Sequence, residues 1–304
     1  MRIAIPGVII IQLIIIFSLL NSAFKPIGPE CAGKFRFTPV ELPDSLSFAG
    51  EDVPLEYFDI LESFDRELLS NSYFHSQTIR LIKLAPRYFS IIEPILKEKG
   101  IPDDFKYLAV AESNLDPRAV SPAMAVGLWQ FLKETAREYG LEVNSEVDER
   151  YHIEKSTYAA CDFFLDSYKK FGSWALVAAS YNGGRSFILQ QIERQKTNNY
   201  FDLLLGEETG RYIFRILALK TIMENPEKYN FSIKNREKYP LIPTKNIKVT
   251  GAVENFADFA KTHGTNYKIL KKFNPWLREA FLTNKTGKEY VIKVPVKNSR
   301  KRFN

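Results

Sequence analysis

Apolar residues recur at helical spacing from Leu55 to about Met223, and no stretch of this range alternates as a strand would. The start of the range shows the spacing clearly, at Leu55, Phe58, Leu61 and Leu68. Amphipathic helices of this kind must bury their apolar faces against one another. We therefore predict an all-helical domain over residues 55–235.

Glycine and proline divide this domain into helix-sized pieces. The helices predicted after Gly100 cover residues 105–112, 128–139, 156–172, 173–183 and 208–223. Pro102 is expected in the first turn of the helix that ends near Glu112, because a first turn leaves its amide hydrogens unused and proline has none. Asp103 and Asp104 suit the positive end of that helix dipole.

The pattern changes near residue 244. Residues 246–251 and 289–295 alternate like strands, and two short amphipathic helices lie between them. This order predicts a small β-α-α-β domain over residues 244–297, followed by a basic tail over residues 298–304. The predicted fold class is therefore mainly α, with a helical domain followed by a small mixed one.

Charge separates the two parts as well. Residues 234–304 contain 17 Lys and Arg and 5 Asp and Glu residues, a net charge of +12, whereas the whole chain carries +6. Such a basic region suggests an anionic polymer or surface as its partner. Because the start of the chain predicts export, cell-wall polymers and membrane surfaces are favoured and nucleic acid is not.

Residues 1–24 have the order of an export segment. A short basic start precedes an apolar run from Ile3 to Leu20, and small residues follow. This order is typical of a cleaved signal peptide, and an uncleaved membrane anchor is the alternative, since about 18 apolar residues approach the length that spans a bilayer. We expect an exported protein of the periplasm or cell envelope, with membrane association left open. Residues 25–54 are predicted as an extended linker or an irregular wrap.

Cysteine and histidine point to no metal or cofactor. Cys161 lies in an apolar-periodic helix and is expected as a buried thiol, whereas Cys31 lies too far beyond the apolar run to be a lipoprotein cysteine. A disulfide between them is left open. His75, His152 and His263 are isolated, with no pair at metal-ligand spacing. We expect no metal, no cofactor and a monomer.

Glu112 is the residue that helical patterning does not explain. Phe105, Leu108 and Ala109 form an apolar stripe, and Glu112 takes the next position of that stripe, seven residues after Phe105. A carboxyl group pressed into apolar surroundings has a raised pKa, which suits a general acid near neutral pH. A solvated surface group or a helix-cap partner is the alternative that the pattern leaves open.

Several strings that include or follow Glu112 occur in a characteristic order, namely AESNLDPRAVSPAMAVGLWQF, VAASYNGG and EETGRYIFRILA. Over roughly residues 40–225 this order resembles the SLT domain of lytic transglycosylases, within the lysozyme-like superfamily, and most of all the membrane-bound lytic murein transglycosylase D subgroup. Residues 246–295, with FNPWL and YVIKVP, resemble a LysM module, which binds glycans that contain GlcNAc. The resemblance implies a lysozyme-like catalytic domain followed by a domain that binds peptidoglycan strands.

The resemblance also implies roles for single residues. Glu112 matches the family's catalytic acid, beside Ser113. The matches assigned to substrate binding are Ser121, Trp129, Gln130, Tyr181, Asn182 and Tyr212. Alternatively, Trp129 and Tyr181 are core aromatics, Gln130 is a helix former, and Asn182 with Gly183 is a helix cap. Met124 stands where the family often has glycine, which puts fine substrate preference in question.

The implied reaction needs one carboxyl group, whereas standard glycosidases use two. Glu112 would protonate the oxygen between MurNAc and GlcNAc and then take the proton of the MurNAc C6 hydroxyl, which closes a 1,6-anhydro ring without water. Asp116, Asp148 and Glu149 are the nearby candidates for a second carboxylate, although a salt bridge suits the VDER segment better. A lysozyme-like hydrolase and a non-catalytic peptidoglycan-binding protein are the alternatives.

Overall fold

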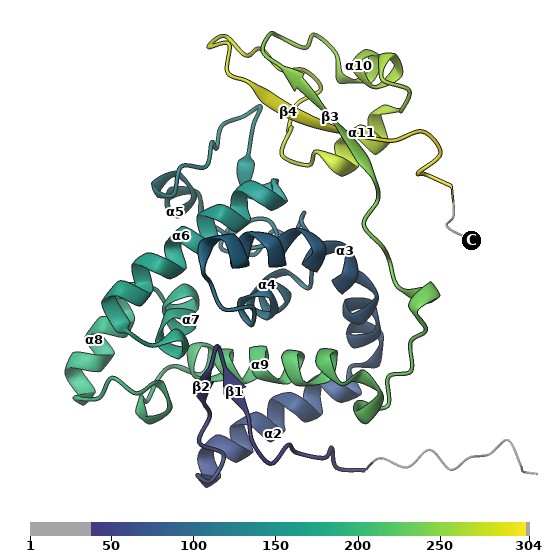
Figure 1. Cartoon of the computed structure of the whole chain (residues 1–304). Coiled ribbons are helices and arrows are strands. Elements are labelled where there is room, and N and C mark those ends of the chain that lie inside the picture. The colour runs from purple at the N-terminus through teal and green to yellow at the C-terminus, as the bar shows by residue number, and fades with distance from the viewer. Residues whose placement is uncertain (1–37, 302–304) are drawn as a thin grey trace, which may run out of the picture. The chain divides into compact units, whose positions relative to one another are not determined.

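The computed structural model describes residues 38–301, whose helices and strands appear in Figure 1. The predicted signal or anchor segment, Cys31 and the last three residues of the basic tail lie outside this range. Within it, no helix combines the length and the apolar character needed to cross a lipid bilayer. Cys161 is buried and is a free thiol.

The first part of the described chain is helical. A two-strand hairpin, β1 (Ser47–Phe48) and β2 (Glu51–Asp52), precedes the helices α2 (Phe58–Tyr73), α3 (His75–Lys99), α4 (Phe105–Ser113), α5 (Lys133–Glu138), α6 (Ile153–Phe171), α7 (Trp174–Gly183), α8 (Arg185–Gln195) and α9 (Glu207–Glu224). α4 packs against α3 and α9, and its apolar stripe is fully buried at Phe105, Leu108 and Ala109. Core packing therefore fixes the last turn of α4, which holds Glu112.

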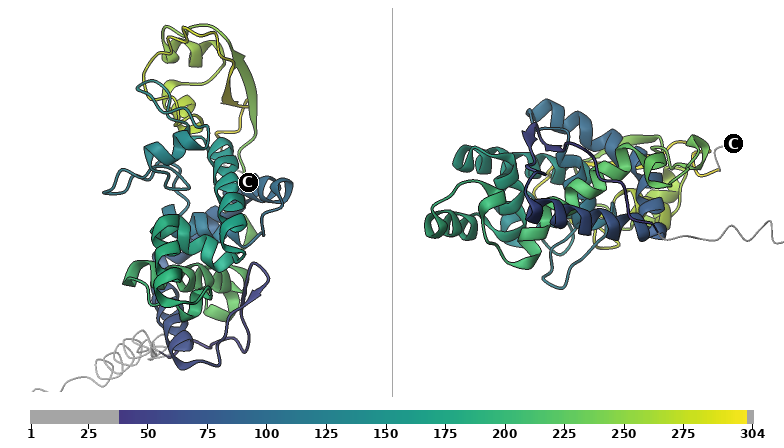
Figure 2. Two further views of the ribbon diagram at one scale, coloured as in Figure 1. Left: turned by 90° about the vertical axis from the view of Figure 1, so that its left-hand side faces the viewer. Right: turned by 90° about the horizontal axis from the view of Figure 1, so that it is seen from below.

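A small mixed domain follows. Its elements are β3 (Thr244–Val249), α10 (Phe256–Thr262), α11 (Tyr267–Phe273) and β4 (Tyr290–Pro295), which lie together in Figures 1 and 2. The strands are antiparallel, with Thr244 opposite Pro295 and Val249 opposite Tyr290. The predicted fold class, a mainly helical chain that ends in a β-α-α-β domain, is confirmed.

Two helix boundaries differ from the predictions. The helix predicted over residues 128–139 is only α5, because the chain before it turns at Gly127 and Gln130, which have positive φ angles of 84° and 49°. Pro102 lies in a turn before α4 rather than in its first turn, and Asp104 is the N-cap residue.

Two further segments were not anticipated. α8 has only Ile188 and Gln191 buried, so its apolar stripe is too weak for periodicity to reveal it. The segment predicted as a linker or wrap ends in the β1–β2 hairpin, which was not itself predicted, and Phe48 of this hairpin is 1% exposed and packs on Phe105. This part of the linker is therefore a portion of the helical core.

The small domain packs on residues 142–154 of the helical domain. Val126, Val147 and Tyr151 are buried in one apolar cluster with residues of the small domain, Trp276 and Leu277 among them. The backbone N–H of Asp148 donates to the Trp276 carbonyl at 2.9 Å, and that of Arg278 donates to the Glu146 carbonyl at 2.7 Å. The two domains thus share a packed core, in addition to the chain segment that joins them.

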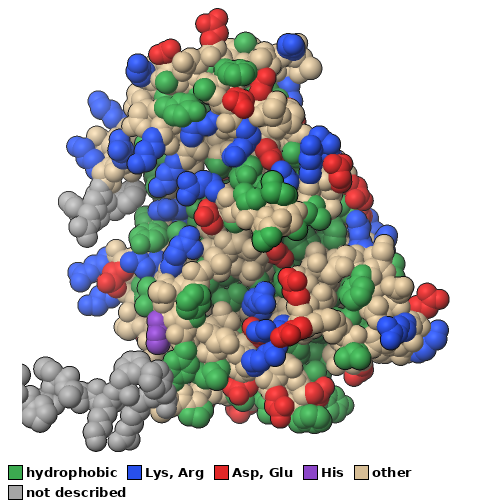
Figure 3. All heavy atoms as spheres, turned by 180° about the vertical axis from the view of Figure 1, so that it is seen from behind, with side chains coloured by type: hydrophobic (Ala, Val, Ile, Leu, Met, Phe, Trp, Pro, Cys, Tyr) green, Lys and Arg blue, Asp and Glu red, His purple; other side chains and the backbone are tan. Residues whose placement is uncertain are grey.

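Charged side chains are unevenly placed on the surface. In Figure 3, many Lys and Arg side chains gather on the left of the upper half, whereas Asp and Glu side chains are scattered, at the top, on the right and along the bottom. The exposed basic residues of the small domain include Lys245, Lys248, Lys261, Lys268, Lys272 and Lys285. The basic region that the sequence predicts is therefore solvent-facing.

Candidate active site

Glu112 lies in the last turn of α4 and is half-buried. Burial raises the pKa of its carboxyl group from 4.5 to about 7. The Tyr212 hydroxyl on α9 donates a hydrogen bond to Glu112 Oε1, and this bond and the charge of Arg215 lower the pKa without offsetting the burial. Near neutral pH the group is therefore present in both forms, so it can act as an acid and then as a base.

Glu112 opens into a cavity of about 750 Å³, a size typical of ligand sites. All the predicted site residues except one line this cavity, namely Glu112, Ser121, Gln130, Tyr181, Asn182 and Tyr212. They come from α4, α7, α9 and the loop after α4. The fold thus brings together residues that the sequence separates by as many as 100 positions.

Trp129 is the exception. Its side chain is 0% exposed, packs on Phe164 with 5.8 Å between ring centroids, and donates from Nε1 to the Thr157 hydroxyl at 2.9 Å. The prediction that its side chain lines the cleft is wrong, because a large apolar ring is stabilised most by full burial. Its carbonyl oxygen accepts a 2.6 Å hydrogen bond from the Tyr181 hydroxyl, so Trp129 positions a residue that does line the cavity.

A loop held by close backbone contacts carries Ser121 and Gln130 to the cavity. Gly127 has a φ of 84°, and a Cβ atom added there would lie 2.0 Å from the Arg150 carbonyl oxygen. Only glycine fits this approach. The Gln130 amide nitrogen donates to the Gly127 carbonyl at 2.8 Å, and Ser121 Oγ accepts from the Ala125 N–H at 3.0 Å.

The VDER segment, residues 147–150, stabilises this loop through hydrogen bonds from Arg150. The Arg150 guanidinium pairs with Asp148 at 2.8 Å and donates to the Met124 and Phe131 carbonyls at 3.1 and 3.3 Å. Burial would raise the pKa of Glu149, but its 2.5 Å contact with Lys155 helps to lower it. The salt-bridge interpretation of this segment is confirmed.

Met124 lies at the tip of the same loop. Its φ of 61° is in the left-handed region, which explains why glycine suits this position. The residue is 64% exposed and is not among those that line the cavity. The substitution therefore alters the outer lip of the loop rather than the cavity wall.

The other carboxylates that line the cavity are not the ones that the sequence predicts as a second carboxylate. Asp116, Asp148 and Glu149 do not line the cavity, whereas Glu138 and Glu208 do. Glu138 pairs with Arg185 at 3.4 Å. Glu208 is exposed, and its charge contributes to the raised pKa of Glu112.

Two cavity residues on α9 were missed by sequence reasoning. Glu208, Tyr212 and Arg215 all line the cavity, and they stand at positions i, i+4 and i+7 of the helix. This spacing puts them on one face. The signal was available, because extending that stripe from Tyr212 in both directions would have found the other two.

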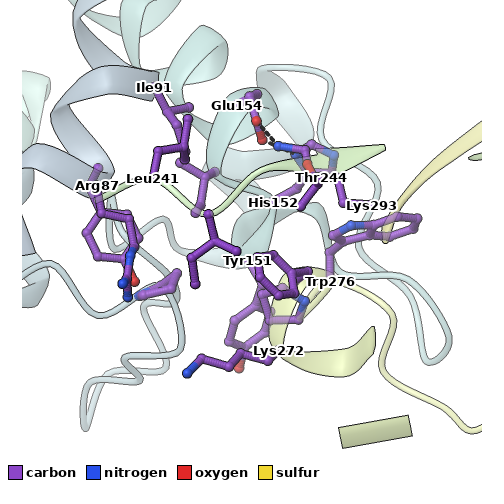
Figure 4. A pocket seen from close by; sticks show the side chains of 16 residues that line it. Arg87, Ile91, Tyr151, His152, Glu154, Leu241, Thr244, Lys272, Trp276 and Lys293 are labelled. Atoms are coloured by element: carbon purple, nitrogen blue, oxygen red, sulfur yellow. Dashed lines mark hydrogen bonds and ion pairs between the residues drawn. The ribbon is translucent and has the colours of Figure 1, made fainter. Parts of the chain in front are cut away.

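A second, smaller cavity of about 100 Å³ lies at the junction of the two domains (Figure 4). Its lining includes Ile91, His152, Trp276 and an ion pair between Glu154 and Lys293, drawn as a dashed line. Burial would raise the pKa of Glu154, but the charge of Lys293 and the hydrogen bond that it donates more than offset this effect and lower the pKa. Burial lowers the pKa of His152 to about 4, so this imidazole is neutral at neutral pH.

Metal chemistry has no visible site in the described part of the chain. Residues 38–301 contain no group of three His, Cys, Asp or Glu side chains placed to hold a metal ion.

Comparison with known proteins gives two family matches. Residues 89–204 match the transglycosylase SLT domain, and residues 245–298 match the soluble lytic transglycosylase C-terminal LysM-like domain. The chain is 30% identical over 264 residues to membrane-bound lytic murein transglycosylase D of two Escherichia coli strains, K12 among them, a region that covers 84% of this chain and 56% of theirs. The chain thus spans about half the length of these curated relatives.

A solved structure is also similar, that of an inactive mutant of the lytic transglycosylase Slt from Pseudomonas aeruginosa. The identity is 18% and the TM-score 0.35, over 50% of this chain and 26% of that chain.

The two family matches show that residues 89–204 belong to the transglycosylase SLT family and residues 245–298 to the LysM-like family of lytic transglycosylase C-termini.

Proposed function

We propose that this protein is a lytic transglycosylase that cleaves the β-1,4 bond between MurNAc and GlcNAc in peptidoglycan. The observation that carries the proposal is the Glu112 carboxyl group, which has a pKa of about 7, accepts a hydrogen bond from Tyr212 and opens into the large cavity. The SLT match and the likeness to lytic murein transglycosylase D favour the same class.

Glu112 acts twice in the proposed reaction. Its protonated form gives a proton to the glycosidic oxygen, so the bond from MurNAc C1 breaks and GlcNAc leaves as an alcohol. The MurNAc C6 hydroxyl then attacks C1 while the Glu112 carboxylate takes the hydroxyl proton. The product is a 1,6-anhydro ring, no water is consumed, and Glu112 ends in its starting form. A pKa near neutrality suits both steps.

The other cavity residues bind the sugar in this proposal. The loop that Arg150 supports carries Ser121 and Gln130 to the substrate, and Ser121 lies toward the N-acetyl group. Asn182 Oδ1 accepts from the Thr209 hydroxyl at 2.8 Å, which leaves the Asn182 amide hydrogens for substrate. The Tyr181 hydroxyl is bonded to the Trp129 carbonyl, so Tyr181 contributes its ring.

The setting of the reaction is also part of the proposal. The LysM-like domain would hold the enzyme, as a monomer, on peptidoglycan strands in the cell envelope, and its basic surface favours anionic wall polymers. We expect full-length Glu112→Gln to co-sediment with purified sacculi at low salt. Failure to bind would remove the anchoring role from the small domain.

The mass of the products tests the chemistry. Wild-type protein incubated with purified sacculi is expected to release anhydro-muropeptides. Products about 18 mass units heavier, with water added, would mean a hydrolase that uses a second carboxylate. Glu208 is the residue that favours this alternative, because it lines the cavity and its charge is felt by Glu112. If the protein is such a hydrolase, Glu208→Gln should abolish the release of products. If it is a transglycosylase, the same variant should keep most of its activity.

A further inference from the structure

The cavity contains two arginines in different states. Arg185 is paired with Glu138 at 3.4 Å, and its guanidinium carbon lies 4.6 Å from the centre of the Phe163 ring. Arg215 also lines the cavity and is half-buried, but its guanidinium forms no hydrogen bond or ion pair with any residue from 38 to 301. Arg215 is thus the cavity cation whose hydrogen-bonding groups the protein leaves unused.

The position of Arg215 on α9 is fixed by the helix. It stands three residues after Tyr212, on the face that meets Glu112. Its charge lowers the pKa of both Glu112 and Tyr212, so it lies near the reacting carboxyl group although it is not bonded to it. A guanidinium presents a planar array of donors that matches a carboxylate in a bidentate manner.

We propose that Arg215 binds a carboxylate on the lactyl–peptide arm of the MurNAc unit that Glu112 cleaves. This inference rests on the proposed function. Glu112 must lie at the MurNAc C1–oxygen bond, and the sugar rings beside that bond are neutral. The anionic groups of the substrate are on the arm, either the lactyl carboxylate of a strand without peptide or the first free carboxylate of a peptide stem.

A competing role for Arg215 acts through Glu112 alone. Its charge favours the Glu112 carboxylate, so Arg215 could be a positioning residue that supports the base step. That role predicts an equal loss of rate on every substrate and a shift of the pH profile. Binding of a substrate carboxylate predicts a loss only on substrates that carry the charge, and mainly in KM.

The experiment compares soluble glycan strands in four forms: with stems, without stems after amidase treatment, and each of these after carbodiimide amidation of its carboxylates. We expect wild-type kcat/KM to fall about 10- to 100-fold when the relevant carboxylate is neutralised, as for one charge-assisted hydrogen-bonded pair. The stem-bearing and stemless arms show which carboxylate is bound. Arg215→Gln should lower activity on the charged form about 10- to 100-fold more than on the neutral form, so that the variant no longer distinguishes the two.

Controls separate the outcomes. Arg215→Lys should restore part of the preference, because it keeps the charge without the bidentate geometry. Arg194→Gln, an exposed residue outside the cavity, should match wild type. A wild-type enzyme indifferent to amidation, or an Arg215→Gln variant slowed equally on all four forms, would overturn the proposal. If wild type cleaves no form, the proposed function itself fails.

Discussion

The large cavity and the junction cavity each contain a partly buried glutamate, and the pKa values of these two carboxyl groups shift in opposite directions. Burial raises the pKa of Glu112 to about 7, and the only hydrogen-bond partner of that carboxyl among the described residues is the Tyr212 hydroxyl. In the junction cavity, burial would do the same to Glu154, but the Lys293 ion pair lowers its pKa.

The difference between the two carboxyl groups lies in the partner rather than in burial. An ammonium group at ion-pair distance fixes a carboxylate in its charged form and makes it a structural anchor. A hydroxyl donor supports the anion less strongly, so the proton remains exchangeable near neutral pH. The same residue type is thereby prepared for chemistry in one cavity and for domain packing in the other.

The largest expected effect separates the two glutamates by activity. Glu112→Gln should lower muropeptide release at least about 1,000-fold, since amide groups cannot transfer the proton. Glu154→Gln should keep activity within about threefold of wild type, because Glu154 is not in the large cavity. Release from purified sacculi, with circular dichroism to confirm folding, measures both. Appreciable activity in Glu112→Gln would refute the assignment of the catalytic acid.

Stability against pH gives the second test. Below pH 4.5 Glu112 is protonated in both the folded and the unfolded chain, so its ionisation does not change the free energy of unfolding. Between pH 4.5 and about 7 the unfolded chain releases this proton while the folded one keeps it, so the contribution of Glu112 to stability falls as pH rises. Glu112→Gln should therefore match wild type near pH 4 and exceed it by about 3 kcal/mol above pH 7.

The difference between variant and wild type in urea unfolding at each pH isolates this group. Glu154 should give the opposite sign. Its folded pKa is lowered, so its contribution to stability is present above its unfolded pKa and is lost as pH falls. A Glu112→Gln difference that does not depend on pH would mean that Glu112 is not desolvated in the folded protein.

The sequence predicted one cavity far better than the other. A helical stripe identified Glu112, because burial in a helix leaves a period that can be counted, and motif order identified its partners on α7 and α9. The prediction for the Trp129 side chain was wrong because a motif identifies a residue that the family needs, but it does not show whether the side chain or the backbone carbonyl is used. The Glu154–Lys293 pair spans 139 positions between two domains, and no local pattern encodes such a contact.

The third prediction removes the cation of the junction cavity. Lys293→Met should destabilise the protein by about 1 to 2 kcal/mol at pH 7, because it leaves Glu154 partly buried without its partner. Lys297→Met, a change of an exposed lysine on the same domain, is the matched control and should be near neutral. Adding Glu154→Gln to Lys293→Met should recover part of the loss, and a double mutant as unstable as the single one would show that the ion pair is not the cause.

The smallest expected effect tests the hydroxyl partner of Glu112. Tyr212→Phe removes the hydrogen bond that favours the carboxylate, so the pKa of Glu112 should rise further above 7. The alkaline limb of the pH–rate profile should then move up by at most about one pH unit, which corresponds to about 1 kcal/mol. Tyr168→Phe, at a partly exposed tyrosine outside the cavity, should leave the limb in place. If the limb moves down in Tyr212→Phe, the hydroxyl does not support the anion, and the contrast between a hydroxyl and an ammonium partner cannot explain why the two glutamates differ.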